Sequence, residues 1–394
     1  MHIVMVVYEV YARDARVRRH SRALVQAGHA VTVLAVGGAG AEGAALADGV
    51  ELMSVVPAKY RGDRKGTYVL AYAMFFARVF SVIFRSTLRR PPDAVYVNNP
   101  PDALVFAAWP ARVRGAKIIL DVHDQTSELY AAKFGQASGL GSRVIELVER
   151  ISYRFADALV TVADAYRARI QRIVGNDMTV ATVWNVPDVD DWLTIGAARL
   201  DRSVGEKPLR LGHHGTIVER FGIDRAVDAV DMLHQRGFPV TLDILGDGDF
   251  ADAVERRIAQ GRLQSVVRFD RRSFDHADLI EFTERIDIGI APYRPSEFIG
   301  HSLPTKLLEY CALGIPTIVT ETEMIRDYLS DGVRLVRTGS PEELVDAITE
   351  LADPVRRTML REAGLGIARR YGWAQQRNNL LGLVAHVQKV GSAT

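Results

Sequence analysis

The chain has 394 residues, of which 48% are hydrophobic and 25% charged, and its formal net charge is +1. This length favours two globular domains of similar size, and the balanced charge excludes a protein that binds nucleic acid through bulk positive charge. The single cysteine, Cys311, excludes an internal disulfide and a cysteine-based metal site. We expect it to be a packed core thiol in a reducing, cytoplasmic compartment.

The chain begins M-H-I-V-M-V-V-Y-E-V, without a basic segment or a small-residue cleavage site. This stretch therefore predicts a first buried strand rather than a signal peptide. No run of about 20 uncharged apolar residues occurs in the sequence, so we also predict no membrane span.

Short apolar runs alternate with helical patterns through the first half, which is typical of a parallel α/β sheet. We expect a domain over residues 1–187, with strands at Ile3–Tyr8, Ala30–Val36, Glu51–Val56, Ala94–Val97, Lys117–Val122, Ala158–Thr161 and Val180–Val183. Helices are expected between them, including Ala15–Gln26, Pro101–Val113, Arg143–Phe155 and Ala165–Val174.

The loop after the first strand carries Asp14, Arg16 and Arg18. In a doubly wound sheet such a loop lies at the carboxyl end of a strand and opens onto the ligand crevice. One interpretation is substrate binding, with the arginines available for phosphate or carboxylate groups. The other is a helix start, with Asp14 as the N-cap and the arginines on the outer side.

Residues 68–84 read Y-V-L-A-Y-A-M-F-F-A-R-V-F-S-V-I-F, and Arg85, Arg89 and Arg90 follow. Apolar residues occupy nearly every side of the predicted helix. It is therefore either a core helix between the sheet and another layer, or a helix that lies at a membrane surface. The second alternative predicts peripheral membrane contact through Tyr68–Arg90.

The fifth predicted strand ends in Asp121-Val122-His123-Asp124. Parallel sheets bind ligands at the carboxyl ends of their strands. A histidine between two carboxylates at this place predicts an active-site residue, and Asp124 can hold the imidazole in one tautomer.

Strand character is lost over residues 188–207, where we expect a linker, and a second α/β domain follows over residues 208–371. Its first strand, from Leu209, runs into Gly215, which lets a ligand approach the backbone closely, and Arg220 lies where the next helical region starts. Further strands are expected at Val240–Leu245, Val266–Phe269, Ile286–Ala291, Ile315–Val319 and Val333–Val336. Helices are expected at Ala251–Gln260, His276–Thr283, Pro341–Leu351 and Val355–Arg370, with a last one over about residues 372–394.

The segment P-T-K-L-L-E-Y-C-A-L-G-I-P, from Pro304 on, predicts a short helix and its end. The N-terminus of a helix at the end of a parallel sheet favours an anion. Lys306 adds positive charge there, and Glu309, one turn further, can accept hydrogen bonds from a ribose. The pattern therefore predicts a nucleotide site, and its alternative is an ordinary crossover helix with solvated Lys306 and Glu309.

This segment resembles the donor site of the retaining GT-B glycosyltransferases of family 4 (GT4). In that family a Glu-x7-Glu motif spans the helix, and its second Glu, which matches Glu309, holds the donor ribose. The first Glu contacts the transferred sugar. It falls at His301, so this sequence departs from the family pattern there.

The resemblance extends to the rest of the chain. It implies a histidine at the place of His123 that contacts the donor sugar. It also implies a glycine and two basic residues that grip the diphosphate after the first strand of the second domain. Gly215 and Arg220 match that pattern, whereas Thr216 stands where the first basic residue is expected, which leaves Lys306 as the second cation.

The implied fold is α/β of the GT-B type, with two Rossmann-like parallel-sheet domains facing across a cleft and a terminal helix that returns to the first domain. The implied enzyme is a hexosyltransferase-type glycosyltransferase. It moves a sugar from a UDP- or GDP-linked donor to a glycan or lipid-linked acceptor with retention, without a metal. The expected setting is synthesis of cell-surface polysaccharide or glycoconjugate, in the cytoplasm or at the inner face of the membrane.

We expect His123, Arg220 and Lys306 to be catalytic. The expected donor-binding residues are Gly215, Thr216, Arg220, His301, Thr305, Lys306 and Glu309, and the expected acceptor-binding residues are Asp14, Arg16, Arg18 and Asp124. Two alternatives stay open: a GT-B epimerase, which needs no acceptor, and an inactive nucleotide-sugar-binding protein, which Thr216 and His301 make conceivable. A nicotinamide-dependent dehydrogenase is disfavoured because no glycine fingerprint follows the first strand.

Overall fold

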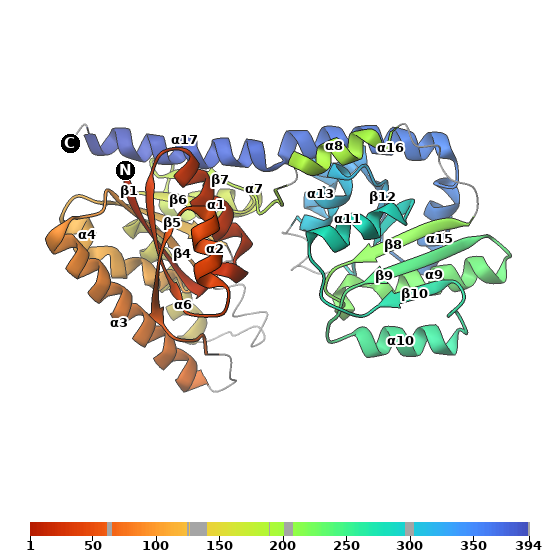
Figure 1. Cartoon of the computed structure of the whole chain (residues 1–394), viewed down its shortest axis with the longest axis horizontal. Helices are drawn as coiled ribbons and strands as arrows, with labels where there is room; N and C mark the ends of the chain where they lie inside the picture. Colours follow the sequence, from red (N-terminus) through yellow and green to blue (C-terminus); the bar gives the residue numbers. More distant parts are fainter. Residues whose placement is uncertain are drawn as a thin grey trace. The chain divides into compact units, whose positions relative to one another are not determined.

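The computed structural model describes residues 1–60, 65–123, 126, 140–188, 190–200, 208–295 and 303–392. The chain divides into two compact units, residues 1–185 with 376–394, and residues 186–375 (Figure 1). Each unit is built around one parallel sheet, as the alternation of apolar runs and helical patterns predicts.

The sheet of the first unit has seven strands in the order β3-β2-β1-β4-β5-β6-β7. These strands are β1 (His2–Val10), β2 (Ala30–Val36), β3 (Glu51–Val56), β4 (Ala94–Asn98), β5 (Lys117–Val122), β6 (Ala158–Thr161) and β7 (Thr179–Thr182). The central strands are continuous buried apolar runs because helices cover both faces. The strand order reverses between β1 and β4, so the carboxyl ends of these two strands flank a switch point.

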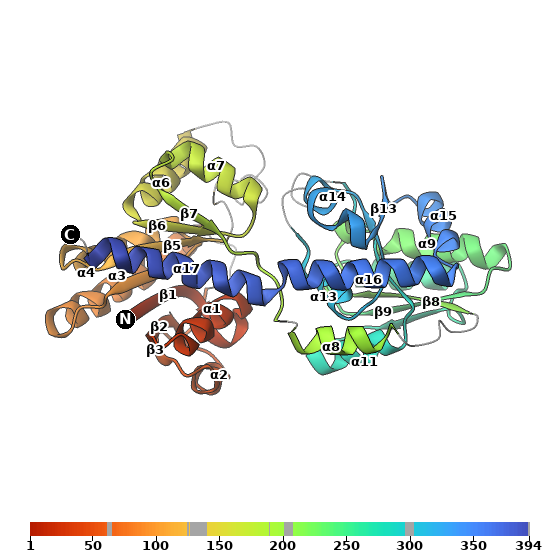
Figure 2. The same ribbon diagram turned by 90° about the horizontal axis from the view of Figure 1, so that it is seen from above.

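The helical segments of the first unit are η1 (Tyr11–Arg13), α1 (Ala15–Gln26), α2 (Ala41–Asp48), α3 (Lys65–Arg89), η2 (Asp102–Ala108), α4 (Trp109–Val113), α6 (Leu140–Phe155) and α7 (Asp164–Val174). The last helix, α17 (Trp373–Ser392), contributes its residues from Gln376 on. It and α3 lie on opposite sides of the sheet (Figures 1 and 2). Helix α2 fills the gap between the second and third strands, where the sequence predicts a helix without giving its bounds.

Helix α3 is buried along one side only. Phe75, Val79 and Ile83 are fully buried, four residues apart, whereas only 17% of its most apolar 18-residue window is buried. The core-helix interpretation is therefore wrong for the outer side of this helix. Among the described residues, α3 is the one helix long and apolar enough to cross a membrane, judged by length and composition alone.

The sheet of the second unit has six strands in the order β10-β9-β8-β11-β12-β13. They are β8 (Leu209–His214), β9 (Val240–Leu245), β10 (Val267–Asp270), β11 (Ile288–Ala291), β12 (Thr317–Thr320) and β13 (Arg334–Val336). The order reverses between β8 and β11, so a second switch point lies where these two strands end.

On one side of the second sheet lie α8 (Asp190–Ala198), α11 (His276–Glu284), α13 (Thr305–Ala312), α14 (Glu323–Leu329) and α16 (Pro354–Tyr371) (Figures 1 and 2). The other side carries α9 (Ile223–Gln235), α10 (Ala251–Gln260) and α15 (Pro341–Glu350), and the short segments η3 (Glu219–Phe221) and η4 (Ser330–Gly332) connect elements. The segment expected as a linker, residues 188–207, contains α8. This helix packs on α13 and α16 and buries Trp192, so it is an element of the second unit.

Close backbone contact explains why α8 carries a glycine. A Cβ added at Gly196 would lie 2.2 Å from the carbonyl oxygen of Ala312 and 2.9 Å from the amide nitrogen of Gly314. Since no side chain fits there, this crossing sets how closely α8 approaches the end of α13.

We predict that Gly196→Ala lowers the free energy of unfolding of the second unit by about 1–3 kcal/mol, because the methyl group overpacks this crossing. Gly43→Ala is the matched control: Gly43 is also helical, and nothing lies within 4 Å of an added Cβ. It should be neutral or stabilise by about 0.5–1 kcal/mol. Urea unfolding followed by circular dichroism measures both, and equal effects of the two substitutions would contradict the prediction.

Candidate functional site

Helix α13 forms where the sequence predicts it. Pro304, with φ −65°, precedes its first turn, and Gly314, with φ +64°, follows its end in a left-handed conformation that glycine favours. The apolar side chains of the helix, including Leu307, Leu308 and Cys311, are buried, and Cys311 lies against Gly364 of α16. The prediction of a packed core thiol is confirmed, and burial raises the pKa of the Cys311 thiol to about 12.

Lys306 points its amine back toward the end of β8. The side chain is 7% exposed, and its Nζ lies 3.3 Å from Nε2 of His213. Nδ1 of the same imidazole lies 2.8 Å from the carbonyl oxygen of Ile290, which can only accept. The proton is therefore on Nδ1, and Nε2 accepts a hydrogen bond from the lysine.

The charge of Lys306 is poorly solvated. Its Nζ lies 4.9 Å from the ring centroid of Phe221 and 5.9 Å from that of Tyr293, so aromatic faces replace part of its water. Burial lowers the pKa of Lys306 to about 8, although the carboxylate of Glu309 acts to raise it. Burial of His213 and the nearby ammonium of Lys306 hold the pKa of His213 well below its ordinary value.

The side chain of Glu309 is held by His214, the residue of β8 that follows His213. Its Oε2 accepts a hydrogen bond of 2.8 Å from Nε2 of His214, which is itself buried. Burial lowers the pKa of His214, with Glu309 opposing the shift. The imidazole is therefore a neutral donor near pH 7, and Glu309 stays partly exposed.

His213 and His214 are consecutive residues at the carboxyl end of β8, so both contacts attach α13 to the same end of this strand. Lys306 and Glu309 lie one turn apart on α13, and the Tyr310 hydroxyl donates a 3.1 Å hydrogen bond to the carbonyl oxygen of Gly212. Three side chains thus tie α13 to the last three residues of β8, at the switch point between β8 and β11. Sequence reasoning missed both histidines, although H-H-G at a strand end was a usable signal.

The other predicted donor residues lie around this point. Gly215 has φ +118°, and an added Cβ would lie 3.1 Å from Nζ of Lys306, so a side chain there would displace the lysine. Thr216 and Arg220 are exposed, with the Arg220 guanidinium carbon 5.2 Å from the ring centroid of Phe221. Thr305 is the first residue of α13. His301 lies outside the described residues.

A buried charged cluster lies at the carboxyl end of β5 in the first unit. The Asp121 carboxylate accepts hydrogen bonds from Nε and Nη2 of Arg16, at 3.1 and 2.8 Å, and from the Tyr96 hydroxyl at 3.0 Å. Burial alone would raise the pKa of Asp121, but the Arg16 guanidinium holds it well below its ordinary value. Burial and Arg16 together lower the pKa of His20, whose Nδ1 lies 3.3 Å from Asp121, to about 3.

His123 lies at the edge of this cluster and is partly exposed. Its Nε2 is 3.3 Å from Oδ2 of Asp121, and its backbone amide donates to Oδ1 of Asn99 at 2.7 Å. Asn99 in turn donates to Asp102, whose pKa burial raises to about 6. The described carboxylate beside His123 is therefore Asp121, which sequence reasoning did not assign. Asp124, predicted for that role, lies outside the described residues.

The structure gives the predicted acceptor residues internal partners. Asp14 caps α1 by accepting from the amide of Val17, as the helix-start interpretation predicts. Arg16 is buried on Asp121 and the carbonyl oxygen of Val183, not on the outer side of the helix as that interpretation expected. Arg18 pairs with Asp48 and is half-buried. These bonds account for the three side chains without a substrate, and their role in acceptor binding stays a prediction.

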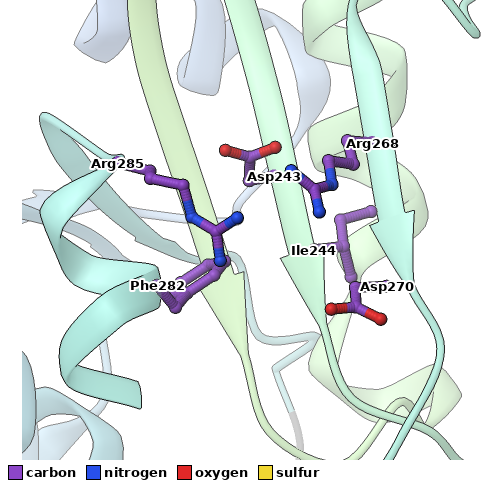
Figure 3. Close-up of a pocket in the computed structure, with 6 residues that line it drawn as sticks. All are labelled: Asp243, Ile244, Arg268, Asp270, Phe282 and Arg285. Carbon is purple, nitrogen blue, oxygen red and sulfur yellow. The ribbon is translucent and has the colours of Figure 1, made fainter. Parts of the chain in front are cut away.

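Figure 3 shows a small hollow in the second unit that is separate from the predicted donor residues. Its lining combines two carboxylates and two guanidinium groups with apolar side chains: Asp243, Ile244, Arg268, Asp270, Phe282 and Arg285. Burial raises the pKa of Asp243, and the guanidinium groups of Arg268 and Arg285 act to lower it. Over the residues that the structure describes, no group of three or more His, Cys, Asp or Glu is placed to hold a metal ion.

Two parallel-sheet units of the Rossmann type define the GT-B class, which confirms the predicted α/β fold. Similar solved structures include the Anabaena protein HepE in complex with UDP, with a TM-score of 0.72 and 14% identity over 98% of this chain and 100% of HepE. Sucrose-phosphate synthase from Thermosynechococcus elongatus gives 0.69 and 14% over 100% of both chains. WaaG, a glycosyltransferase involved in lipopolysaccharide biosynthesis, gives 0.63 and 17% over 95% of this chain and 97% of WaaG.

Family comparisons agree with this class. Residues 14–185 match the glycosyl transferase 4-like domain, and residues 208–353 match the glycosyl transferases of group 1. The two matches together cover most of the sequence, and both are to domains of glycosyltransferases. No curated protein sequence matches it significantly.

The buried pair of Asp121 and Arg16 provides a stability test. We predict that Asp121→Asn lowers the free energy of unfolding of the first unit by about 3–5 kcal/mol, because it leaves the Arg16 charge buried without compensation. Glu9→Gln is the control, since Glu9 and Lys59 form a half-exposed pair of 2.7 Å and should cost less than about 1 kcal/mol. Denaturant unfolding measures both, and a small effect at Asp121 would contradict the proposed role of this pair.

Proposed function

We propose that this chain is a retaining GT4-type hexosyltransferase. It transfers a sugar from a UDP- or GDP-linked donor to a glycan or lipid-linked acceptor in the synthesis of cell-surface polysaccharide or glycoconjugate. The observation that carries this proposal is the placement of Lys306 and Glu309 one turn apart at a switch point, each fixed by a histidine of β8. A cation and a carboxylate at this spacing fit the diphosphate and the ribose of one nucleotide.

The chemistry follows from where charge develops. As the bond between the anomeric carbon and the diphosphate breaks, negative charge grows on the departing phosphate. Lys306, Arg220 and the N-terminus of α13 supply positive charge for that oxygen, and this arrangement works without a metal ion. The acceptor hydroxyl attacks the anomeric carbon on the face that the phosphate leaves, and its proton passes to a phosphate oxygen. This front-face route gives retention.

Similar structures support the donor and the pathway. HepE has been seen with UDP and with UDP-glucose, and WaaB is a lipopolysaccharide outer core galactosyltransferase. We propose that the nucleotide binds to the second unit, with Glu309 on the ribose and Gly215, Thr216 and Thr305 beside the phosphates. The first unit takes the acceptor, and its His123 contacts the transferred sugar. The proposed location is the cytoplasm, at the inner face of the membrane.

The first test is calorimetric binding of UDP, GDP, dTDP and ADP without metal. We predict one tight binder, and we predict that Lys306→Ala removes the binding and costs on the order of 10²–10³ in transfer rate. Because Lys306 has a lowered pKa of about 8, its charge is lost as the pH rises through that value. Affinity should therefore fall between pH 7 and 9, and binding at pH 8 should take up a proton.

Lys306→Ala should bind weakly at every pH and show no such dependence. Absence of binding by all four nucleotides would refute the donor site. Tight binding without any transfer to glycan or lipid acceptors would instead refute transferase activity and leave a binding protein.

A second test separates the ribose from the diphosphate. We predict that Glu309→Ala weakens nucleoside diphosphate binding about 10- to 100-fold, as expected for loss of a charged hydrogen bond, and leaves inorganic pyrophosphate binding unchanged. His214→Ala should follow the same pattern more weakly, because Glu309 loses its 2.8 Å donor and its fixed orientation. Lys306→Ala, by contrast, should lose both ligands. Equal loss of pyrophosphate and nucleotide in the Glu309 variant would contradict the ribose assignment.

A further inference from the structure

The outer side of α3 is an apolar surface. Six large side chains are exposed on it, from 37% at Phe80 to 68% at Val69: Val69, Leu70, Met74, Phe80, Phe84 and Leu88. Phe76, Phe80 and Phe84 stack in sequence, with ring centroids 6.4 and 6.5 Å apart. An exposed apolar surface of this extent is unusual on a soluble domain and marks an interaction site.

Helix α4 extends this surface. It packs against α3, and its Trp109 and Val113, one turn apart, are 57% and 71% exposed. Tryptophan is the side chain most typical of the boundary between water and lipid. We call the outer side of α3 together with Trp109 and Val113 the α3–α4 face.

The charged side chains of α3 and α4 are all positive. The sequence from Lys65 to Arg90 contains no Asp or Glu, and neither does the segment from Trp109 to Gly115. Arg85, Arg89 and Arg90 are exposed at the carboxyl end of α3, and Arg114 follows α4. Apolar side chains bordered by arginines are complementary to a surface that is both apolar and anionic, which describes a bilayer with acidic headgroups.

The inner side of α3 argues against a membrane span. Phe75, Val79 and Ile83 are fully buried within the first unit, and Nη1 of Arg78 donates to the carbonyl oxygen of Val55 on β3 at 2.9 Å. A spanning helix would have to leave the sheet and expose this core. These contacts fit a helix that lies along a surface better than one that crosses a membrane.

We propose that the α3–α4 face is a docking surface for an anionic lipid bilayer. The apolar side chains enter the interface between headgroups and acyl chains, while the arginines pair with lipid phosphates. This proposal adds the lipid surface to the proposed function, because a lipid-linked acceptor is presented at such a surface. It rests on the α3–α4 face alone and does not depend on the donor site.

The test is flotation of the full chain with vesicles of phosphatidylcholine, alone or mixed with phosphatidylglycerol. We predict binding that requires phosphatidylglycerol and weakens with salt. Phe84→Glu with Leu88→Glu should abolish it. Arg85→Gln and Arg89→Gln should each weaken it about fivefold, the value expected for one basic residue near an anionic surface.

The matched control is Val355→Glu with Met359→Glu on α16, two apolar side chains one turn apart that are 66% and 64% exposed. This variant should float as the unchanged protein does. Nucleotide binding and thermal unfolding of every variant show whether the chain is folded, and they separate failure of the docking surface from failure of the donor site.

Equal flotation with neutral vesicles would overturn the proposal, as would loss of flotation in the α16 control. Dimerisation through the α3–α4 face without lipid, seen by light scattering and removed by the α3 substitutions, would also contradict it. Resistance of the bound protein to alkaline carbonate extraction would also overturn it, because a surface-docked helix is released and a spanning one is not.

Discussion

The second unit depends on the attachment of α13 to the end of β8. Lys306 and Glu309 are flexible side chains on an eight-residue helix, and each would lose considerable rotamer freedom on binding a ligand. Contacts with His213 and His214 remove that freedom before the ligand arrives. The close contact of α8 at Gly196 then sets how near the end of α13 lies to α8. Because these side chains are already ordered, less free energy is lost to ordering them when a ligand binds.

The buried charged residue of each unit has a different set of partners. In the first unit, Asp121 has a full set of partners, so its charge is compensated inside the protein and its pKa is low. In the second unit, Lys306 has an imidazole nitrogen and aromatic faces but no direct carboxylate contact among the described residues, and its pKa falls to about 8. An incompletely compensated cation gains most when an anion binds, which is the behaviour that a diphosphate site needs.

Much of this structure follows from local sequence patterns. Strands such as Ala30–Val36 and Lys117–Val122, and helices such as Ala15–Gln26, have their predicted bounds because apolar periodicity and caps are local. The contacts that fix the site are not local: His213 and Lys306 are 93 residues apart, and Arg16 and Asp121 are 105 apart. Sequence reasoning could place Lys306 on a helix, but no pattern in a single sequence identifies the residue that it contacts. The buried and exposed sides of α3 could not be distinguished from the sequence either. Both sides are apolar, and only packing against the rest of the first unit determines which one is buried.

The departures from the family pattern have a physical consequence for the proposed mechanism. Thr216 carries no charge where a basic residue is expected, so the positive charge offered to the diphosphate rests on Arg220 and Lys306. Arg220 is exposed and therefore screened by solvent and salt. Lys306 is buried, where a unit charge acts through a lower effective dielectric and its influence on an anion is larger. With one expected cation missing, the geometry that keeps Lys306 buried against His213 becomes the main source of the attraction on which transfer would depend.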